Sequence, residues 1–136
     1  MLRYRLIHPE VLAALAAAGH GSRVLIADGH YPVSTGVSPS ATRVFLNLAP
    51  DVPSTPEVLE VLLDAIVVES ATLMQPPASD PEPTIFEEIE ALLVESAQRL
   101  DRFAFYAAAR SEDVALVIAT GERRVYANVL LTLGVV

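Results

Sequence analysis

Two short, almost continuously apolar runs, Arg23–Ala27 and Val114–Ala119, constrain the fold of this chain more than any other feature. Runs of this length, followed by glycine and polar residues, are typical of strands that are buried on both faces of a sheet. The segments between them carry helix-start signals and apolar residues at helical spacing. The alternation of helices with short buried strands predicts a layered α/β domain.

Start and stop signals place the helices. The first helix is expected to begin at Pro9, because proline is favoured in a first helical turn, and to end at Gly19 as its C-cap. Ser54 and Thr84 are each followed three residues later by glutamate, which is the spacing of a capping box. Both residues are therefore predicted to begin helices. A fourth helix is predicted to follow Asp101.

The remaining segments are less regular. A proline-rich stretch at 75–83 predicts an exposed loop. Phe103 and Phe105, in the fourth helix, are expected to pack in the core. Three further segments are assigned to two strands and one ambiguous element: 42–48, 67–74 and 125–133. No internal repeat or linker is visible, so residues 1–136 are predicted to form one domain.

Composition excludes several classes of function. Cysteine and lysine are both absent, which rules out thiolate nucleophiles, cysteine–zinc sites, Schiff-base lysines and phosphate-loop lysines. The net charge of −8 and the pI near 4.7 argue against nucleic acid and anionic membranes as partners. A neutral ligand fits this charge better. The lack of cysteine and of a secretory signal predicts a cytoplasmic location.

The chain is also apolar for a soluble domain. Hydrophobic residues make up 52% of it, and the mean hydropathy is +0.43. No run approaches the roughly 18 apolar residues of a membrane span. We therefore expect the surplus to lie in interfaces of a homo-oligomer.

Three titratable residues near the first strand are candidates for chemistry. His20 lies between two glycines, so it is either a solvent-exposed turn residue or a general acid or base that a ligand can approach closely. Asp28 and His30 share the end of the strand Arg23–Ala27. Asp28 either braces its loop or acts as a carboxylate that orients a histidine or binds a hydroxyl. The spacing of these residues matches no metal-binding histidine pair, so no metal site is predicted.

Two further pairs carry groups that suit a hydroxylated ligand. Tyr126 and Asn128 are two residues apart, so in a strand they would face the same side and offer a phenol and an amide. Arg102 and Tyr106 are four apart, on one face of a helix. The alternative for each pair is a solvated surface position. No Gly-x-Ser-x-Gly elbow and no phosphate-binding glycine pattern occurs.

Together these segments resemble the ribose pyranase and fucose mutarotase family. The resemblance extends in order over nearly the whole chain and is specific in combination. The segment from Arg102 to Tyr106 is similar to the fucose branch. Ser22 stands where the family often has an acidic residue, and the region from Val52 to Ser96 matches poorly. The matching segments are Gly19–Gly21, Ala27–Pro32, Arg102–Tyr106, Thr120–Glu122, Tyr126–Leu131 and Gly134–Val135.

The resemblance implies a three-layer α/β/α domain with a mainly parallel sheet. It also implies a ring-shaped homo-oligomer, often a decamer, in which neighbouring subunits share each site. The implied reaction is interconversion of anomers or ring forms of a free monosaccharide without a cofactor, with L-fucose the first candidate and ribose the second. By position, His20 and Asp28 match catalytic residues. Four residues match sugar-binding positions: Arg102, Tyr106, Tyr126 and Asn128.

Two other interpretations stay open. A sugar-binding accessory protein of carbohydrate uptake would need the tyrosine, asparagine and arginine contacts but no tuned histidine. A purely structural ring-forming protein would need only the apolar surplus.

Overall fold

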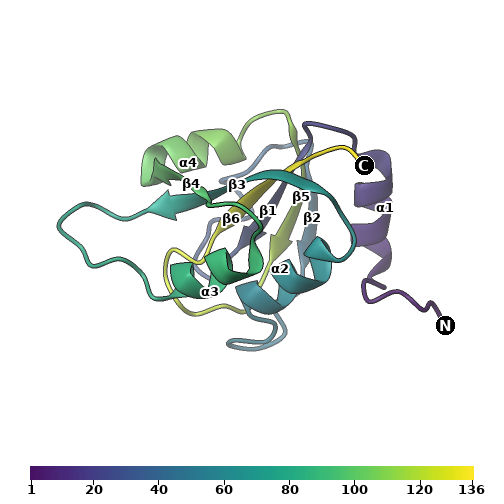
Figure 1. The fold of residues 1–136 in the computed structure, drawn as a ribbon, viewed down its shortest axis with the longest axis horizontal. Helices are drawn as coiled ribbons and strands as arrows, with labels where there is room; N and C mark the ends of the chain where they lie inside the picture. The colour runs from purple at the N-terminus through teal and green to yellow at the C-terminus, as the bar shows by residue number, and fades with distance from the viewer.

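The computed structural model describes all residues 1–136 and contains a six-stranded sheet covered by helices (Figure 1). Its strand order is β2-β5-β1-β6-β3-β4. The elements are α1 (Pro9–Ala17), β1 (Arg23–Ala27), β2 (Thr42–Phe45), α2 (Thr55–Leu63), β3 (Val68–Gln75), α3 (Ile85–Leu92), β4 (Gln98–Asp101), α4 (Arg102–Ala109), β5 (Val114–Ala119) and β6 (Val129–Leu133).

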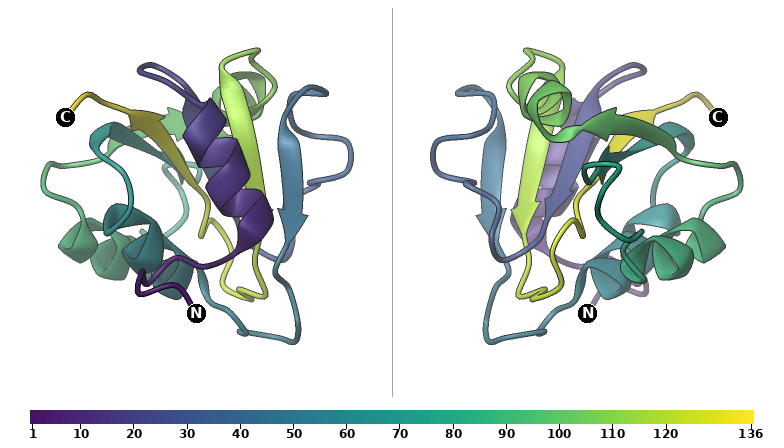
Figure 2. Two further views of the ribbon diagram at one scale, coloured as in Figure 1. Left: turned by 90° about the vertical axis from the view of Figure 1, so that its right-hand side faces the viewer. Right: turned by 90° about the vertical axis from the view of Figure 1, so that its left-hand side faces the viewer.

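The predicted α/β/α layering with a mainly parallel sheet is confirmed. β1 is parallel to β5, β5 to β2, and β3 to β4, whereas β6 runs antiparallel to both of its neighbours, β1 and β3. One buried cluster joins the sheet to α1, α2 and α3, and a second joins the opposite face to α4 and the loop 31–41. Opposite views accordingly place α1 or α4 in front of the strands (Figure 2).

The two apolar runs that suggested buried strands form the centre of the sheet. β1 lies between β5 and β6, and its last four residues are completely buried. Burial of apolar surface stabilises such a strand by about 25 cal/mol for each Å² removed from water. The loops at its two ends are therefore attached to a firmly held strand.

Of the three residues expected at helix N-termini, two cap their helices with their side chains. Ser54 and Glu57 form the expected reciprocal capping box, and Asp101 accepts hydrogen bonds from the first turn of α4. Thr84 makes no side-chain cap, because its own backbone is already helical, with ψ of −26°, so the prediction of a capping box there is wrong. The first helix ends at Ala17, with Ala18 rather than Gly19 as its C-cap.

Candidate functional site

The antiparallel strand β6 brings two distant segments to one edge of the sheet. Ile26 pairs with Val129, so the residue that follows β1 meets the residue that precedes β6. Those neighbours are Asp28 and Asn128. Parallel strands gather their chemistry at their carboxyl ends, and here the start of an antiparallel strand joins them there.

Asp28 and Asn128 are bonded to each other twice. The Asp28 backbone N–H donates to Asn128 Oδ1 at 2.8 Å, and Asn128 Nδ2 donates to Asp28 Oδ2 at 3.0 Å. The other carboxylate oxygen accepts the backbone N–H of His30 at 2.9 Å. Both side chains are buried. The carboxylate is therefore held from two sides by neutral donors, with no cation bonded to it.

Burial controls the acidity of Asp28. Desolvation raises the pKa of its carboxyl, and the hydrogen bonds from the backbone of His30 and neighbouring residues oppose this only in part. The net result is a pKa above the ordinary value for aspartate. A carboxyl group in this condition exchanges a proton nearer to neutral pH, as general acid and base catalysts do.

Tyr126 reaches the same place from a loop, not from a strand. β6 begins only at Val129, so the expectation that Tyr126 and Asn128 share one face of a strand is wrong. Tyr126 has φ of +63°, a left-handed conformation that is uncommon for a residue other than glycine. The loop nevertheless brings both side chains to one cavity, as their spacing had suggested.

Arg102 and Tyr106 come from the first turns of α4 and lie together as predicted. Arg102 Nε donates to the Tyr106 hydroxyl at 3.3 Å, and the guanidinium carbon lies 5.5 Å from the centre of the ring. The Tyr106 ring in turn packs edge-on against Tyr31, with centroids 5.5 Å apart. This stack places a cation and a phenol in the wall of the cavity that Asp28 also lines.

These residues surround one cavity of about 280 Å³. Five of the six predicted site residues meet here: Asp28, Arg102, Tyr106, Tyr126 and Asn128. The cavity combines a carboxylate, a guanidinium and phenols with apolar surface, a mixture that suits a small hydroxylated ligand. The remaining lining residues are His30, Tyr31, Met74 and Val125.

His20 is not among them. It precedes β1, whereas Asp28 follows it, so the length of β1 alone separates them by roughly 13 Å at the usual rise of a strand. Its side chain is 59% exposed and its Nε2 donates to Glu69 Oε2 at 2.6 Å. Within one chain, therefore, His20 and Asp28 do not form one site.

Four lining residues are not among the six predicted site residues. His30 had a usable signal, since it stands two residues from Asp28 in the same loop; its Nε2 donates to the Arg123 carbonyl at 2.9 Å. Tyr31 and Met74 belong to the buried core, where their side chains also form the cavity wall. Val125 carried no signal, because an aliphatic residue in a loop suggests no chemistry.

Elsewhere the chain offers less. No group of three or more histidine and acidic side chains is arranged to hold a metal ion. A second cavity of about 270 Å³ lies between the N-terminal segment and α2, and aliphatic side chains such as Leu6, Val58 and Leu62 form most of its wall. None of the four helices has the length and hydropathy that crossing a membrane requires. The predicted cytoplasmic location stays a prediction.

The fold and the cavity define a small α/β/α protein with a polar site containing a carboxylate at one edge of its sheet. The chain belongs to the RbsD / FucU transport protein family, whose model matches residues 1–136. This confirms the resemblance seen in the sequence.

Relatives from both branches of the family are similar over nearly the full length. The chain is 33% identical to the fucose mutarotase of Mus musculus, with 96% of the chain and 90% of the relative covered. It is 35% identical to D-ribose pyranase 2 of Streptomyces griseus subsp. griseus, with 99% and 98% covered.

Solved structures agree. The structure of Bacillus subtilis RbsD complexed with D-ribose superposes with a TM-score of 0.84 at 26% identity, covering 100% of this chain and 99% of that one. The fucose mutarotase of Streptococcus pneumoniae in complex with L-fucose gives 0.82 at 26% identity, with the same coverage.

Proposed function

We propose that this protein is an isomerase that interconverts the anomers or ring forms of a free monosaccharide without a cofactor. The single observation that carries the proposal is the buried Asp28 carboxylate, with its raised pKa, in the wall of a cavity that also holds Arg102 and Tyr126. The relatives named fucose mutarotase and D-ribose pyranase support the same reaction class.

The chemistry requires two proton transfers. A base takes the proton of the anomeric hydroxyl while an acid protonates the ring oxygen; the bond between the anomeric carbon and the ring oxygen then breaks and leaves an aldehyde. Rotation and reclosure reverse these steps and return both protons. Positioned acid–base groups accelerate such steps by about 10²–10⁴-fold. In our proposal Asp28 supplies one group, and Arg102, Tyr106, Tyr126 and Asn128 hold the sugar hydroxyls.

His20 supplies the second group from another copy of the chain. Because His20 and Asp28 lie at opposite ends of β1, one molecule cannot bring them together, whereas a ring of subunits, for example a decamer, can. The exposed position of His20 and its bond to Glu69 support this role, since the carboxylate orients the imidazole. Large exposed apolar side chains, including Phe45, Leu48 and Phe103, support subunit contacts.

L-fucose is the first candidate substrate and D-ribose the second. The segment from Arg102 to Tyr106 resembles the fucose branch, and its arginine and tyrosine line the cavity. The test is saturation-transfer NMR of anomeric protons across a panel of aldoses. Faster exchange with protein than in buffer supports the proposal and names the substrate. Equal rates for every sugar would reject the enzyme.

The second candidate is a sugar-binding accessory protein, which the description of the family as transport proteins favours. It would use the same cavity for binding without proton transfer. The panel also separates the two functions, because line broadening without faster exchange would identify a binder.

Replacing His20 by alanine is expected to remove most of the exchange activity while the fold and assembly stay intact. The side chain is 59% exposed and bonds only to Glu69, so little packing depends on it. We expect a loss of about 10²–10⁴-fold, the usual contribution of one acid–base group. Exchange rates, thermal unfolding and light scattering on the variant check this. A variant that exchanges sugar at the wild-type rate would remove His20 from the mechanism.

The rate of exchange is expected to fall as the pH drops through the raised pKa of Asp28, above the ordinary aspartate range near 3.8. If Asp28 acts as a base, only its carboxylate form is active. The free energy of unfolding responds in the opposite direction. Because the pKa of Asp28 is higher in the folded state than in the unfolded state, its contribution to stability is complete below the unfolded-state pKa and is lost as the pH rises through the folded-state pKa. Carbon NMR of the Asp28 carboxyl and a pH–rate profile test both statements. Titration of Asp28 at or below 3.8 would contradict them.

A further inference from the structure

Glu122 is one of only two acidic side chains that are buried, and the proposed mechanism does not use it. Its side chain is 1% exposed, yet it does not line the cavity. A buried carboxylate is costly unless it is paired and hydrogen-bonded. The burial of this carboxylate, in the loop that leads to Tyr126, therefore requires an explanation.

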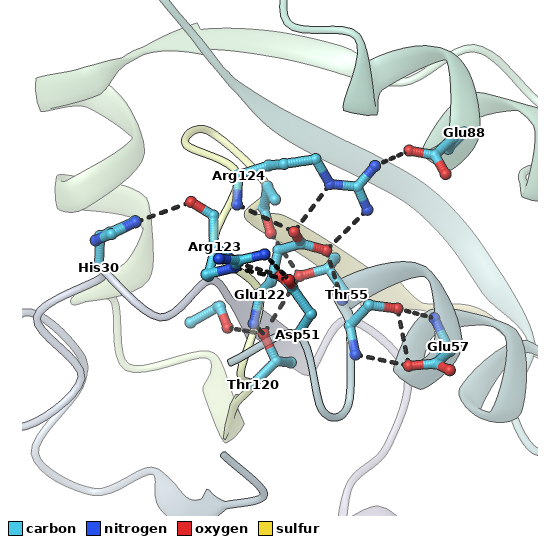
Figure 3. Close-up of polar contacts among 12 residues, drawn as sticks. His30, Asp51, Thr55, Glu57, Glu88, Thr120, Glu122, Arg123 and Arg124 are labelled. Atoms are coloured by element: carbon cyan, nitrogen blue, oxygen red, sulfur yellow. Dashed lines mark hydrogen bonds and ion pairs between the residues drawn. The ribbon is translucent and has the colours of Figure 1, made fainter. Parts of the chain in front are cut away.

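The Glu122 carboxylate is bonded on all sides (Figure 3). Oε1 accepts the backbone N–H of Arg124 at 3.0 Å and Arg124 Nε at 2.9 Å, while Oε2 accepts Arg124 Nη2 at 3.0 Å and the Thr55 N–H at 3.3 Å. Burial acts to raise the pKa of Glu122, but the bonds from Arg124 and Thr55 outweigh it, and the pKa lies below the ordinary value. The group therefore stays ionised and holds both the backbone and the side chain of Arg124.

The ends of this loop are fixed by other contacts. The Glu122 carbonyl accepts the Gly29 N–H at 2.8 Å, which joins the loop to the segment after β1. The Thr55 hydroxyl donates to the Ala127 carbonyl at 2.8 Å, next to Asn128. Between these two anchors Arg123 bonds Asp51 through its backbone N–H and its side chain, and the Glu122 carboxylate holds the backbone N–H and the inner side of the guanidinium of Arg124. Tyr126 follows Arg124 by two residues, in its left-handed conformation.

We infer that Glu122 is a positioning residue for the sugar site: by holding Arg124, its carboxylate sets the place of Tyr126 in the cavity. Glu122 never touches the ligand and acts through the loop. The inference rests on the proposed function for the effect on sugar, although the placement of Tyr126 can be measured without sugar.

The test begins with Glu122→Gln, which keeps the shape but sets an amide N–H₂ against the donors of Arg124 or Thr55. We expect the sugar concentration for half-maximal exchange to rise by about twofold to tenfold, the range for one weakened hydrogen bond from Tyr126, with a smaller change in the saturated rate. Arg124→Lys, which keeps the charge and loses the two-point contact, is the second variant, for use if Glu122→Gln does not fold. Glu88→Gln is the matched control: Glu88 bonds the outer side of Arg124 and is exposed, so exchange is expected to stay at the wild-type level.

A double-variant cycle separates positioning from simple support of the fold. If Glu122 acts through Tyr126, then Tyr126→Phe weakens sugar binding in the wild type but adds little in the Glu122→Gln background. Additive losses, or a lowered melting temperature with unchanged half-maximal concentration, would overturn the inference.

NMR of the Tyr126 ring and of the Asn128 side-chain amide gives a readout that needs no sugar. Both sets of signals are expected to shift in Glu122→Gln and not in Glu88→Gln. If the wild-type protein exchanges no sugar, the proposed function fails and these shifts alone decide the inference. Unshifted signals in Glu122→Gln would reject it.

Discussion

Swapping Asp28 and Asn128, in the double variant Asp28→Asn with Asn128→Asp, is expected to preserve the fold and to remove most of the anomer-exchange activity. One hydrogen bond joins the two side chains, and a second runs from the Asp28 backbone N–H to Asn128 Oδ1; the swapped pair can form both. Asn at 28 still accepts the His30 N–H through its carbonyl and donates to the new carboxylate. Only the position of the negative charge changes, by about the length of one hydrogen bond.

The single variants are expected to be much worse folded than the pair. Asp28→Asn sets an amide N–H₂ against another donor, either Asn128 Nδ2 or the His30 N–H. Asn128→Asp puts two carboxylates within hydrogen-bond distance in a buried site, where one must keep a proton. The pKa of this pair of carboxyl groups is raised in the folded state. The Asn128→Asp variant is therefore expected to lose stability as the pH rises and to recover it in acid.

Urea unfolding of the four proteins and anomeric exchange by NMR check this cycle. Near-wild-type stability of the double variant, with a rate reduced by about 10²–10⁴-fold, would separate the catalytic role of Asp28 from its structural one. A double variant that exchanges sugar normally would show that a carboxylate at 28 is not needed. A double variant as unstable as the singles would show that other contacts dominate.

Gly121→Ala is expected to destabilise the fold strongly. A Cβ there would overlap the Ala49 carbonyl and would lie 2.8 Å from the Val52 nitrogen and 2.9 Å from its oxygen. These are backbone atoms, and the Gly121 N–H also donates to the Pro53 carbonyl at 2.9 Å, so the loop cannot move aside locally. Overpacking of this kind costs about 1–3 kcal/mol, and more where several backbone segments must shift.

The matched control is Gly19→Ala, because a Cβ at Gly19 meets nothing within 4 Å. Its unfolding free energy is expected to stay within about 0.5 kcal/mol of the wild type. Denaturant unfolding of both variants measures the two free energies of unfolding. Equal stabilities for the two variants would mean that the contact around Gly121 is less tight than the structure describes. Because Gly121 adjoins Glu122, sugar binding is also expected to weaken in Gly121→Ala.

Burial explains which elements could be predicted from the sequence. The central strands β1 and β5 are buried on both faces, so their apolar runs identify them. β4, at the edge of the sheet, has the sequence Gln-Arg-Leu-Asp and no apolar pattern, and the sequence did not predict it. Phe103 was expected in the core and is 77% exposed, whereas Phe105 is fully buried. Apolar character alone does not determine which side of a short helix faces inward.

The candidate site was predictable where residues follow a buried strand and less so in the long loop. Asp28 could be placed from β1, and Arg102 with Tyr106 from their helical spacing. The left-handed backbone of Tyr126 has no signature in a segment that looks like a strand. The mutual bonding of Asp28 and Asn128 depends on pairing across 100 residues of chain, which one sequence does not reveal.

The place of β1 between β5 and β6 also has a consequence for biosynthesis. Both neighbours of this central strand come from residues 114–133, although β1 itself is made near the start. While the ribosome is still adding the intervening residues, this buried apolar strand has neither of its partners. Such non-local pairing slows folding and leaves unpaired edges open to aggregation. A chain that ended before Val129 would lack β6, so it could neither close its sheet nor complete the cavity at Asp28.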